Sequence, residues 1–477
     1  MTEKPFLNSN GHLDFAPDDP SNPKNWSTKR KCYITGVSIL FVVNATFASS
    51  APSGALQGIS QDLHTSIEAA GLVTTMFLLG YCAGPLIWAP LSEFYGRRYI
   101  FYITFSLYFI LNFLCAFTPN FAGLLLGRFL SSTFASSALS NTPGVLGDIW
   151  NPTERGNAMI LFSIMTFVGP ALGPVVSGFL ELKESWRWTF YVLLWLAGVT
   201  EILLFTIPET LPSIILLNKA RDIRKNSSEN DSHVIIAPVE ATDRHLASIF
   251  KAALTRPWKI LFDPISFLVA LYYSVVYTLL YMLFSIYPIV FQQKRGWNYG
   301  VGELPLIGVV IGGCLGGLFI YFLNTREKRK TLTTRSYRPR TPEDRLPVAM
   351  VGGILFAVTI FWFAWSAELN SVHWIVPTLA GTFLSASILL IFVSYVNYLI
   401  DTYSMFAAST LAANTVARSA CAAASPLFTQ YMFDALGVGG AGSLIGGVAV
   451  VLAPIPFVFY KYGKSIRQRS RFALMRE

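Results

Sequence analysis

The sequence GPLIWAPLSEFYGRR, from Gly84 to Arg98, joins two long apolar segments through a short charged turn. An apolar stretch precedes it, and a second apolar run begins directly after it, at Tyr99. The turn itself carries Glu93 and the adjacent Arg97 and Arg98. Two apolar helices joined by so short a turn predict a membrane hairpin. Charges at such a joint can hold or release neighbouring helices, so the hairpin indicates a membrane protein that moves.

The composition of the whole chain agrees with a membrane protein. Of its 477 residues, 53% are hydrophobic and 13% are charged, and the mean hydropathy is +0.49. Soluble domains carry about 25% charged residues. A membrane-spanning helix needs about 20 apolar residues. Twelve stretches qualify, at approximately 32–51, 68–90, 99–118, 121–147, 157–180, 188–207, 262–291, 302–323, 347–367, 373–399, 405–432 and 441–460.

Positive charge divides unevenly between the two sides of the predicted membrane protein. With both termini placed in the cytoplasm, 30 of the 36 Lys and Arg residues fall in cytoplasmic segments. Four fall on the opposite side, and two, Arg128 and Arg418, fall inside spans. The positive-inside rule predicts this distribution for an even number of spans. The net charge of +9 therefore reflects membrane orientation, and we expect no nucleic-acid partner.

A polar break at about 209–261 separates six predicted spans from six. Transporters often pair two such halves, so we expect an all-α membrane protein with two six-helix bundles. Its parts are a cytoplasmic tail (1–31), two bundles (32–208 and 262–460), a cytoplasmic linker (209–261) and a basic cytoplasmic tail (461–477). A second polar segment, 325–346, is strongly basic. A cytoplasmic loop is the favoured interpretation, and regulation or binding of anionic lipid is the alternative.

Several functional classes lack their characteristic motifs. The five cysteines form no CxxC or Cys/His cluster, so we expect buried free thiols and no metal site. The chain contains no P-loop GxxxxGK[ST], so nothing indicates ATP drive. It also lacks an HExxH motif and a nucleophile elbow, and we do not expect an enzyme.

Ionisable residues inside apolar spans are rare and usually functional. Arg128 lies in LLLGRFLSSTFASS, among serines, which favours a hydrated interior face over a purely structural arginine. Glu201 is the carboxylate expected well inside a span, and Asp148 follows the fourth span. A buried carboxylate can hold a proton near neutral pH. Arg128, Glu201 and Asp148 are therefore the candidates for proton coupling, although Glu201 has the alternative of reaching toward a loop.

The segment GPALGPVVSG concentrates helix-breaking residues within one predicted span, at Gly169, Pro170, Gly173, Pro174 and Gly178. Such a composition disfavours a straight helix. The freed backbone groups must find partners in neighbouring helices. We expect the segment to bend and pack closely against another helix, as a hinge or seal for alternating access. A kinked packing helix without that role is the alternative.

Aromatic and amide side chains mark a candidate substrate cavity. Tyr273, Tyr277, Tyr281 and Phe284 share one helical face by their spacing. Packing is the simpler interpretation of this stripe, and a cavity wall for a planar or amphipathic ligand is the alternative. Candidates on other predicted spans are Asn44, Asn397, Asn414 and Arg418.

Together these motifs resemble those of the major facilitator superfamily over nearly the whole chain, and most closely its fungal twelve-span drug:proton antiporters. LSEFYGRR, Leu91 to Arg98, is similar to the loop motif between spans 2 and 3, with Glu93 at the usual aspartate position. Arg128 matches the span-4 arginine linked to proton coupling, and GPALGPVVSG matches the span-5 antiporter motif. DPSNPKNWS (19–27), ESWRWTFYV (184–192) and PETLP (208–212) also fit.

The resemblance implies proton-driven export by alternating access, with protons as the coupling ion and no other cofactor. The hairpin would then form a conformational latch on the cytoplasmic side, through Gly84, Leu91, Glu93, Gly96, Arg97 and Arg98. Two arginines against one glutamate within the spans favour a neutral or anionic substrate, such as a drug, toxin, secondary metabolite or organic acid.

We expect a monomer in the lipid bilayer of the plasma membrane, with the vacuolar membrane as the alternative. A proton-coupled importer and a polyamine transporter of the same fold remain alternatives for the activity. A non-transporting receptor or channel is the alternative of another class.

Overall fold

The computed structural model describes residues 6–8, 11–226, 236–240, 245–334, 341–470 and 472–473, and their regular elements are helices. The helices before the linker are α1 (Thr28–Ser50), α2 (Leu56–Asp62), α3 (Ile67–Tyr95), α4 (Arg97–Phe117), α5 (Phe121–Ile149), α6 (Pro152–Glu181) and α7 (Arg187–Leu204). The linker holds α8 (Pro212–Asn226) and α9 (Leu246–Leu261). The helices after it are α10 (Pro264–Tyr287), α11 (Tyr299–Glu303), α12 (Ile307–Thr334), α13 (Leu346–Glu368), α14 (Ile375–Thr402), α15 (Ala407–Leu452) and α16 (Ile455–Arg469).

Short helical turns connect several of these helices. They are η1 (Pro23–Asn25), η2 (Ala51–Ala55), the π-helical turn η3 (Pro288–Lys294), η4 (Leu304–Leu306), η5 (Pro342–Arg345) and η6 (Ser404–Phe406).

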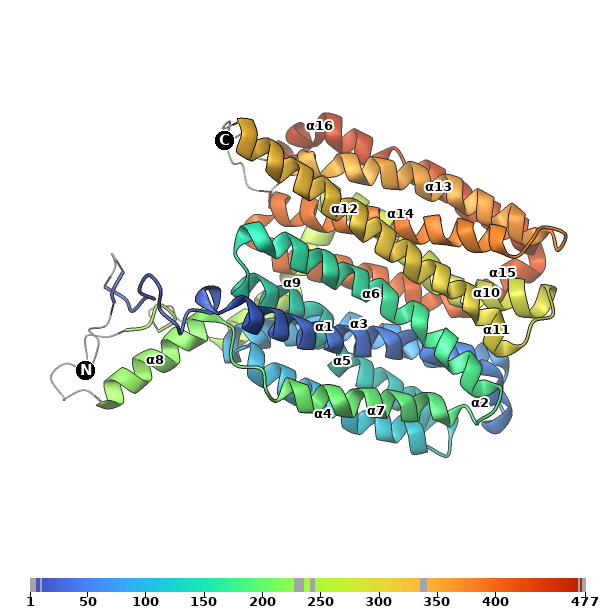
Figure 1. Ribbon diagram of the computed structural model, residues 1–477, viewed down its shortest axis with the longest axis horizontal. Coiled ribbons are helices and arrows are strands. Elements are labelled where there is room, and N and C mark those ends of the chain that lie inside the picture. The colour runs from blue at the N-terminus through green and yellow to red at the C-terminus, as the bar shows by residue number, and fades with distance from the viewer. Residues whose placement is uncertain are drawn as a thin grey trace.

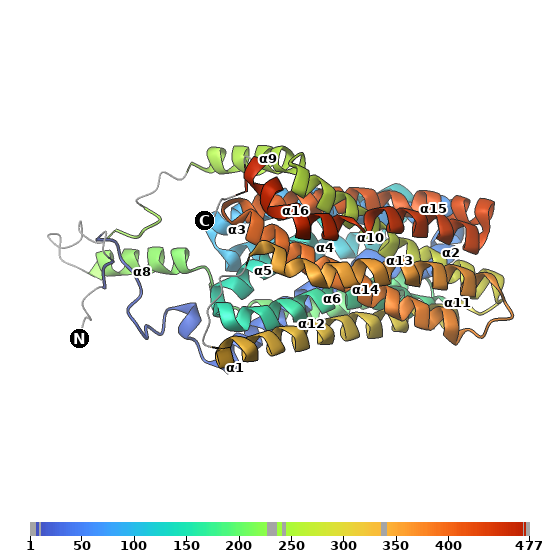
Figure 2. The same cartoon turned by 90° about the horizontal axis from the view of Figure 1, so that it is seen from above.

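The helices form two groups that lie side by side (Figure 1). We call α1 to α7 the N-terminal bundle and α10 to α16 the C-terminal bundle. The start of α1, the turn between α3 and α4, and both linker helices lie at one end of the molecule, where α16 also ends (Figures 1 and 2). The short helices α2 and α11 lie at the opposite end. We call the end that holds α8 and α9 the linker end, and the end that holds α2 and α11 the far end.

Ten segments of the described chain are long and apolar enough to cross a membrane. The predicted hairpin is confirmed, because α3 and α4 are two of these segments and only Gly96 separates them. The helix α5 is not among the ten, since its serines and Arg128 lower its hydropathy. One segment, Ser404–Arg469, is 66 residues long and contains the last two predicted spans. Gly437, with φ of 69°, interrupts its helical backbone between them.

The side chains that face outward are those that a bilayer accepts. Large apolar residues such as Ile202, Phe262 and Val451 are exposed by 70% or more. Exposed apolar surface on this scale marks contact with lipid or a partner. Serines of α5, in contrast, are fully buried, at positions 131, 132, 136 and 137. The fold therefore presents apolar side chains outward and keeps many polar ones inside.

Two sequence expectations need correction. The basic segment expected to be a loop from residue 325 begins as helix, because α12 continues to Thr334. The linker, for which the sequence analysis made no helix prediction, contains the two helices α8 and α9. Of the five thiols expected to be buried, only Cys115 is; Cys32 and Cys421 are exposed. Apolar span residues need not be buried, because a membrane helix places much of its surface against lipid.

Candidate functional site

Arg128 is fully buried where α5 meets α1 and α3. Its Nη2 donates to the carbonyls of Ala48 (2.7 Å) and Ser49 (3.4 Å), and its Nε donates to the carbonyl of Val73 (3.2 Å). The guanidinium lies 4.0 Å from the ring centre of Phe77. Nη1 has no hydrogen-bond partner among the described residues, and the side chain makes no ion pair with them. This cation is held by carbonyl dipoles and an aromatic face, and one donor group is left over.

Arg418 occupies a comparable setting in the C-terminal bundle. It is 7% exposed, and its guanidinium lies 4.8 Å from the Tyr277 ring centre and 4.9 Å from that of Phe392. Tyr273 stacks on Phe392 and donates its hydroxyl proton to the Phe392 carbonyl. One turn earlier on α15, the Asn414 amide donates to the Thr410 carbonyl at 2.9 Å. Aromatic rings thus lie close to this second buried cation, and their π-systems attract its positive charge.

A continuous line of contacts connects the two arginines across the bundles. Ser49, whose carbonyl accepts from Arg128, shares a hydrogen bond of 2.9 Å between its hydroxyl and that of Tyr281. The ring centre of Tyr281 lies 5.1 Å from that of Tyr277, which stacks against Arg418. We call the five residues Arg128, Ser49, Tyr281, Tyr277 and Arg418 the central track. All five are nearly or fully buried.

The structure brings only part of the predicted cavity together. Phe284 packs on Tyr281, with ring centres 5.5 Å apart, and so adjoins the central track. Asn44 does not join it, because its amide donates to Thr200 Oγ1 (2.6 Å) on α7 inside the N-terminal bundle. Asn397 is half-buried and donates to the Val393 carbonyl of its own helix at 2.8 Å.

The three candidates for proton coupling lie apart from one another. Asp148 follows Arg128 by 20 residues on α5, which is about 30 Å along a helix. Glu201 accepts a hydrogen bond from Ser106 and is only half-buried. The expectation that Glu201 lies well inside a span is wrong, since α7 ends at Leu204, three residues later.

A fully buried carboxylate belongs instead to Glu303, which the sequence reasoning missed. It ends α11 and lies at the edge of the predicted span 302–323. The signal was present in the sequence YGVGELP, where an acidic residue stands between glycines and a long apolar run.

The glycines of GPALGPVVSG pack closely, as the sequence predicts, against two different partners. A Cβ atom on Gly169 would lie 2.0 Å from Thr46 Oγ1, and one on Gly173 would lie 2.7 Å from the backbone nitrogen of Ala51. Both contacts lie within the N-terminal bundle, where Ser50 Oγ also donates to the Pro170 carbonyl at 2.6 Å. A Cβ on Gly178 would meet Tyr299 and Glu303 of α11. The motif therefore joins α1 at one part and the C-terminal bundle at the other, while α6 stays one helix through Pro170 and Pro174.

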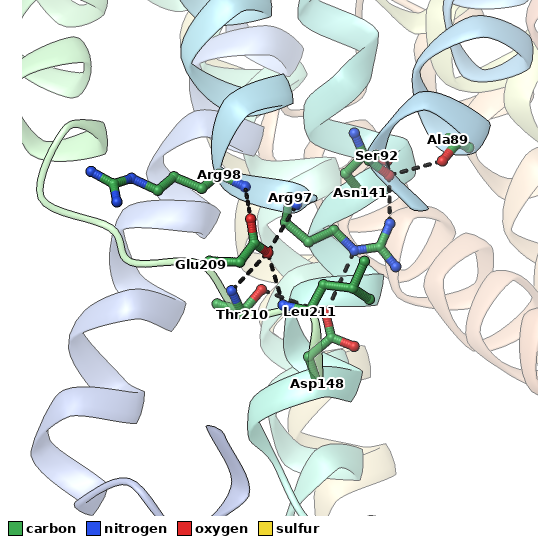
Figure 3. A network of polar contacts seen from close by, with 9 residues as sticks. All are labelled: Ala89, Ser92, Arg97, Arg98, Asn141, Asp148, Glu209, Thr210 and Leu211. Atoms are coloured by element: carbon green, nitrogen blue, oxygen red, sulfur yellow. Dashed lines mark hydrogen bonds and ion pairs between the residues drawn. The ribbon is translucent and has the colours of Figure 1, made fainter. Parts of the chain in front are cut away.

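The turn between α3 and α4 is organised by an acid from a distant part of the chain (Figure 3). Gly96 has φ of +100°, a conformation that favours glycine. The carboxylate of Glu209 accepts from the backbone N–H groups of Arg97 (3.0 Å) and Arg98 (3.2 Å), the first two residues of α4. It also accepts from the N–H groups of Thr210 and Leu211. Glu209 thus caps α4, and the cap favours a negative charge at that helix N-terminus.

The side chain of Arg97 completes this cluster. Its Nη1 donates to Ser92 Oγ at 2.5 Å, and its Nε lies 3.5 Å from Asp148 Oδ2 (Figure 3). Ser92 in turn donates to Asn141 at 2.9 Å. We call Ser92, Arg97, Asn141, Asp148 and Glu209 the N-terminal clasp. It ties α3, α4, α5 and the segment after α7 together. Asp148 therefore lies in this clasp with Arg97 and not beside Arg128.

Other residues of the predicted latch surround the clasp. Gly84 lets α3 approach α5, because a Cβ there would lie 1.6 Å from Ser136 Oγ. Leu91 is half-buried, and Glu93 and Arg98 are exposed. The Arg98 guanidinium donates to Tyr102 at 2.9 Å on its own helix.

The C-terminal bundle carries an equivalent cluster at the same end. Arg345, directly before α13, pairs with Asp401 near the end of α14 at 3.0 Å. Glu343 pairs with Arg467 near the end of α16, also at 3.0 Å. This C-terminal clasp repeats the relation of Arg97 to Asp148, although the two segments share little sequence.

The motif DPSNPKNWS folds against the linker end of the N-terminal bundle. Asp19 pairs with Lys219 of α8 at 2.6 Å, and Trp26 Nε1 donates to the Pro20 carbonyl at 3.1 Å. Partial burial acts to raise the pKa of Asp19, but hydrogen bonds from Lys219 and Ser21 outweigh it and hold that pKa below its usual value. The segment thereby fastens the linker to the start of α1.

A pocket of about 420 Å³ opens at the linker end. It is lined mainly by apolar residues of α3, α9 and α15, with Glu93 and Arg256 among its charged lining residues. Its size falls within the range of small-molecule sites.

Replacing Glu209 with alanine is expected to destabilise the linker end of the N-terminal bundle. The change removes the cap of α4, and loss of a helix cap costs about 0.5–2 kcal/mol. Thermal unfolding of the purified protein in detergent measures the effect. Arg98→Ala is the matched control, because Glu209 binds only the backbone of that residue. Equal unfolding temperatures for Glu209→Ala and the parent would contradict the capping role.

The profile of the Major Facilitator Superfamily matches residues 37–426. The chain belongs to this superfamily. It is therefore a member of a transporter family rather than an enzyme. The resemblance to this superfamily that the sequence motifs carry is confirmed.

Similar proteins with curated names are fungal transporters of the same superfamily. The efflux pump FUB11 of Gibberella moniliformis is 41% identical over 97% of this chain and 77% of its own length. The MFS-type efflux pump MFS2 of Trichophyton rubrum is 40% identical over 97% of this chain and 77% of its own length. Among solved structures, the proton:xylose symporter XylE matches with a TM-score of 0.65 and 15% identity, over 92% of this chain and 96% of its own. At that identity, the match to XylE supports the fold alone.

Proposed function

We propose that this chain is a proton-coupled exporter of small neutral or anionic organic molecules that works by alternating access. The observation that carries the proposal is the central track, which holds one buried guanidinium group in each bundle, Arg128 against Phe77 and Arg418 against Tyr277, and joins them through the Ser49–Tyr281 hydrogen bond. Neither group makes an ion pair with the described residues. Intramembrane cations in such settings mark substrate or proton pathways. The names of the fungal relatives, which are efflux pumps, support export over import.

The proposed architecture has twelve spans in two six-helix bundles, over 32–208 and 262–460, with both termini and the 209–261 linker in the cytoplasm. It counts α5 as a span and divides Ser404–Arg469 at Gly437, which adds two spans to the ten apolar segments. The start of α1 and the end of α16 lie at the same end of the molecule (Figure 1), which supports an even number of membrane crossings. We assign the protein to the plasma membrane as a monomer.

The proposed cycle uses the contacts already described. At the far end, α6 packs on α11, so this conformation is closed on the side away from the linker. Gly169, Pro170, Gly173, Pro174 and Gly178 form the part of α6 along which that closure is made. The proposed latch, Gly84 to Arg98 with the N-terminal clasp, keeps the cytoplasmic ends of α3, α4 and α5 together as the bundles rock. The free Nη1 of Arg128 and the Arg418 guanidinium offer donors to an electron-rich substrate.

The proposal is tested by export of dyes of opposite charge from yeast cells that express the chain. We expect faster efflux of an anionic fluorescein probe than of a cationic rhodamine, because the track presents two cations that make no ion pair with the described residues. A protonophore is expected to stop the efflux. Arg418→Gln is expected to slow anionic efflux by about 5-fold or more, the size of a typical coupling between sites.

Lys183→Ala is the matched control, since this exposed lysine lies in the loop between α6 and α7, away from the central track. Efflux that persists with the protonophore would contradict proton coupling. Net uptake of either probe that depends on expression would overturn export.

A further inference from the structure

The helix α11 is built to lie close to its neighbours at the far end. Its sequence is YGVGE, and Asn298 caps it by accepting from the Val301 N–H at 2.8 Å. A Cβ on Gly300 would lie 2.7 Å from Phe179 of α6, and one on Gly302 would lie 2.4 Å from Gln292 of η3. Only glycine permits both approaches, so the sequence brings the last residue, Glu303, into the contact between α11 and α6.

The Glu303 carboxyl group has almost no polar surroundings. The side chain is 0% exposed. Oε1 accepts one hydrogen bond, from the Gln292 amide at 2.9 Å, and Oε2 is buried with no partner among the described residues. Burying a carboxylate without a charged partner is costly, and such groups take up a proton instead.

The titratable groups on the surrounding elements are engaged elsewhere. Glu181 of α6 accepts the Gly58 N–H at 2.6 Å, and Tyr299 donates to Gln57 at 2.9 Å. Lys294 of η3 pairs with Glu368 at 2.6 Å. Asp62 of α2 pairs with Arg187, also at 2.6 Å. None of these groups neutralises Glu303, so the closed arrangement accommodates the acid in its neutral form.

Glu303 also lies in a contact that alternating access must break. A Cβ on Gly178 would lie 2.9 Å from Glu303 Cγ, and the Tyr299–Gln57 hydrogen bond joins the same two bundles nearby. We call this contact of α6 and η2 with α11 the far-end seam. When α6 and η2 move away from α11, the seam opens and water reaches the carboxyl group.

We propose that Glu303 is a proton-binding site that controls closure of the far-end seam. In the open state the carboxylate takes a proton from the water outside, and the neutral acid then fits the closed seam. On reopening, the same proton returns to that water, so the site needs no other reactant. Because the closed state binds one proton more than the open state, acid outside favours closure. The inference rests on the proposed alternating access, but it does not require that this proton drive export.

The test measures the opening of the seam directly. Spin labels at Lys183→Cys and Ser371→Cys, two exposed far-end positions in different bundles, report the separation by pulsed electron resonance in lipid nanodiscs. The native cysteines are replaced by serine. We expect the short-distance population to grow several-fold as the pH falls from about 8.5 to about 5.5. Glu303→Gln, an isosteric neutral side chain, is expected to hold the short distance at every pH.

Two further variants keep the test decisive. Gln292→Leu removes the one donor that the carboxylate has in the closed state. The charged acid then fits the closed arrangement even less well, so the short distance is expected to be rarer than in the parent at about pH 8.5 and to depend more steeply on pH. Glu181→Gln is the matched control at a neighbouring acid and is expected to follow the parent. A Glu303→Gln protein whose distances follow pH like the parent would overturn the proposal, as would a Gln292→Leu protein that closes at about pH 8.5 more readily than the parent. Because these distances need no substrate, pH-dependent closure alongside export that ignores a protonophore would refute proton-coupled export and leave the Glu303 site standing.

Discussion

Replacing Arg128 with alanine is expected to lower export by about 10- to 100-fold, the upper range of coupling between sites, while the protein still reaches the membrane. The guanidinium holds the carbonyls of Ala48, Ser49 and Val73 in one place. These carbonyls come from α1 and α3, and the Ser49 hydroxyl also contacts Tyr281 of the other bundle. Loss of the side chain therefore breaks the central track at its N-terminal end. Dye efflux, normalised to the amount of protein at the cell surface, measures the change.

Arg128→Lys separates the effect of charge from that of geometry. Lysine keeps the positive charge but lacks the planar fork that reaches several carbonyls at once. We expect it to restore only part of the export and to unfold at a lower temperature than the parent. Efflux at the parent rate in Arg128→Ala would remove Arg128 from the mechanism, and parent-like efflux in Arg128→Lys would assign its role to charge alone.

Replacing Gly173 with alanine is expected to have the second large effect. The new methyl group would lie 2.7 Å from the backbone nitrogen and 3.0 Å from the Cα of Ala51. Backbone cannot swing aside as a flexible side chain does, so α6 must move away from η2. Overpacking of this kind costs about 1–3 kcal/mol. The unfolding temperature of the purified protein and the rate of dye efflux from cells that express it measure the two consequences. Both are expected to fall.

Gly156→Ala provides the matched control on the same helix. A Cβ at Gly156 would meet nothing within 4 Å. Alanine there is expected to be neutral or to stabilise α6 slightly, because it is the better helix former by about 1 kcal/mol. If Gly173→Ala behaves like Gly156→Ala, the close approach of α6 to η2 does not limit stability or transport.

Local sequence patterns were enough to locate the long apolar helices of this protein, although not the helices of the linker. Apolar runs of sufficient length located α3 and α4 on both sides of Gly96, and the spacing of Tyr273, Tyr277 and Tyr281 placed them on one buried face. The glycines of the span-5 motif predicted close packing, because repeated small residues within an apolar span allow a neighbouring helix to approach closely.

Contacts between distant residues were beyond that reasoning. Glu209 reaches the N-terminus of α4 across more than a hundred residues of chain, and its own surroundings, PETLP, carry no sign of a capping role. Asn44 was predicted to line the substrate cavity and Glu201 to carry a proton. Each instead makes a hydrogen bond to a neighbouring helix of its own bundle, which the sequence does not reveal. Which face of a membrane helix meets protein and which meets lipid depends on its neighbours, so burial of Cys32 and Cys421 was predicted wrongly.

The ion pairs of this structure are distributed in a way that bears on the speed of the transport cycle. The seven described ones join groups within one bundle, within the linker, or between the linker and the N-terminal segment. The two bundles touch through neutral groups, such as Ser49 with Tyr281 and Gln57 with Tyr299. Separating them breaks none of these seven pairs, so these pairs add no electrostatic cost to the proposed rocking motion. Turnover of the carrier would then be governed by packing and hydration at the seam, and substitutions there would change its rate more than its folding.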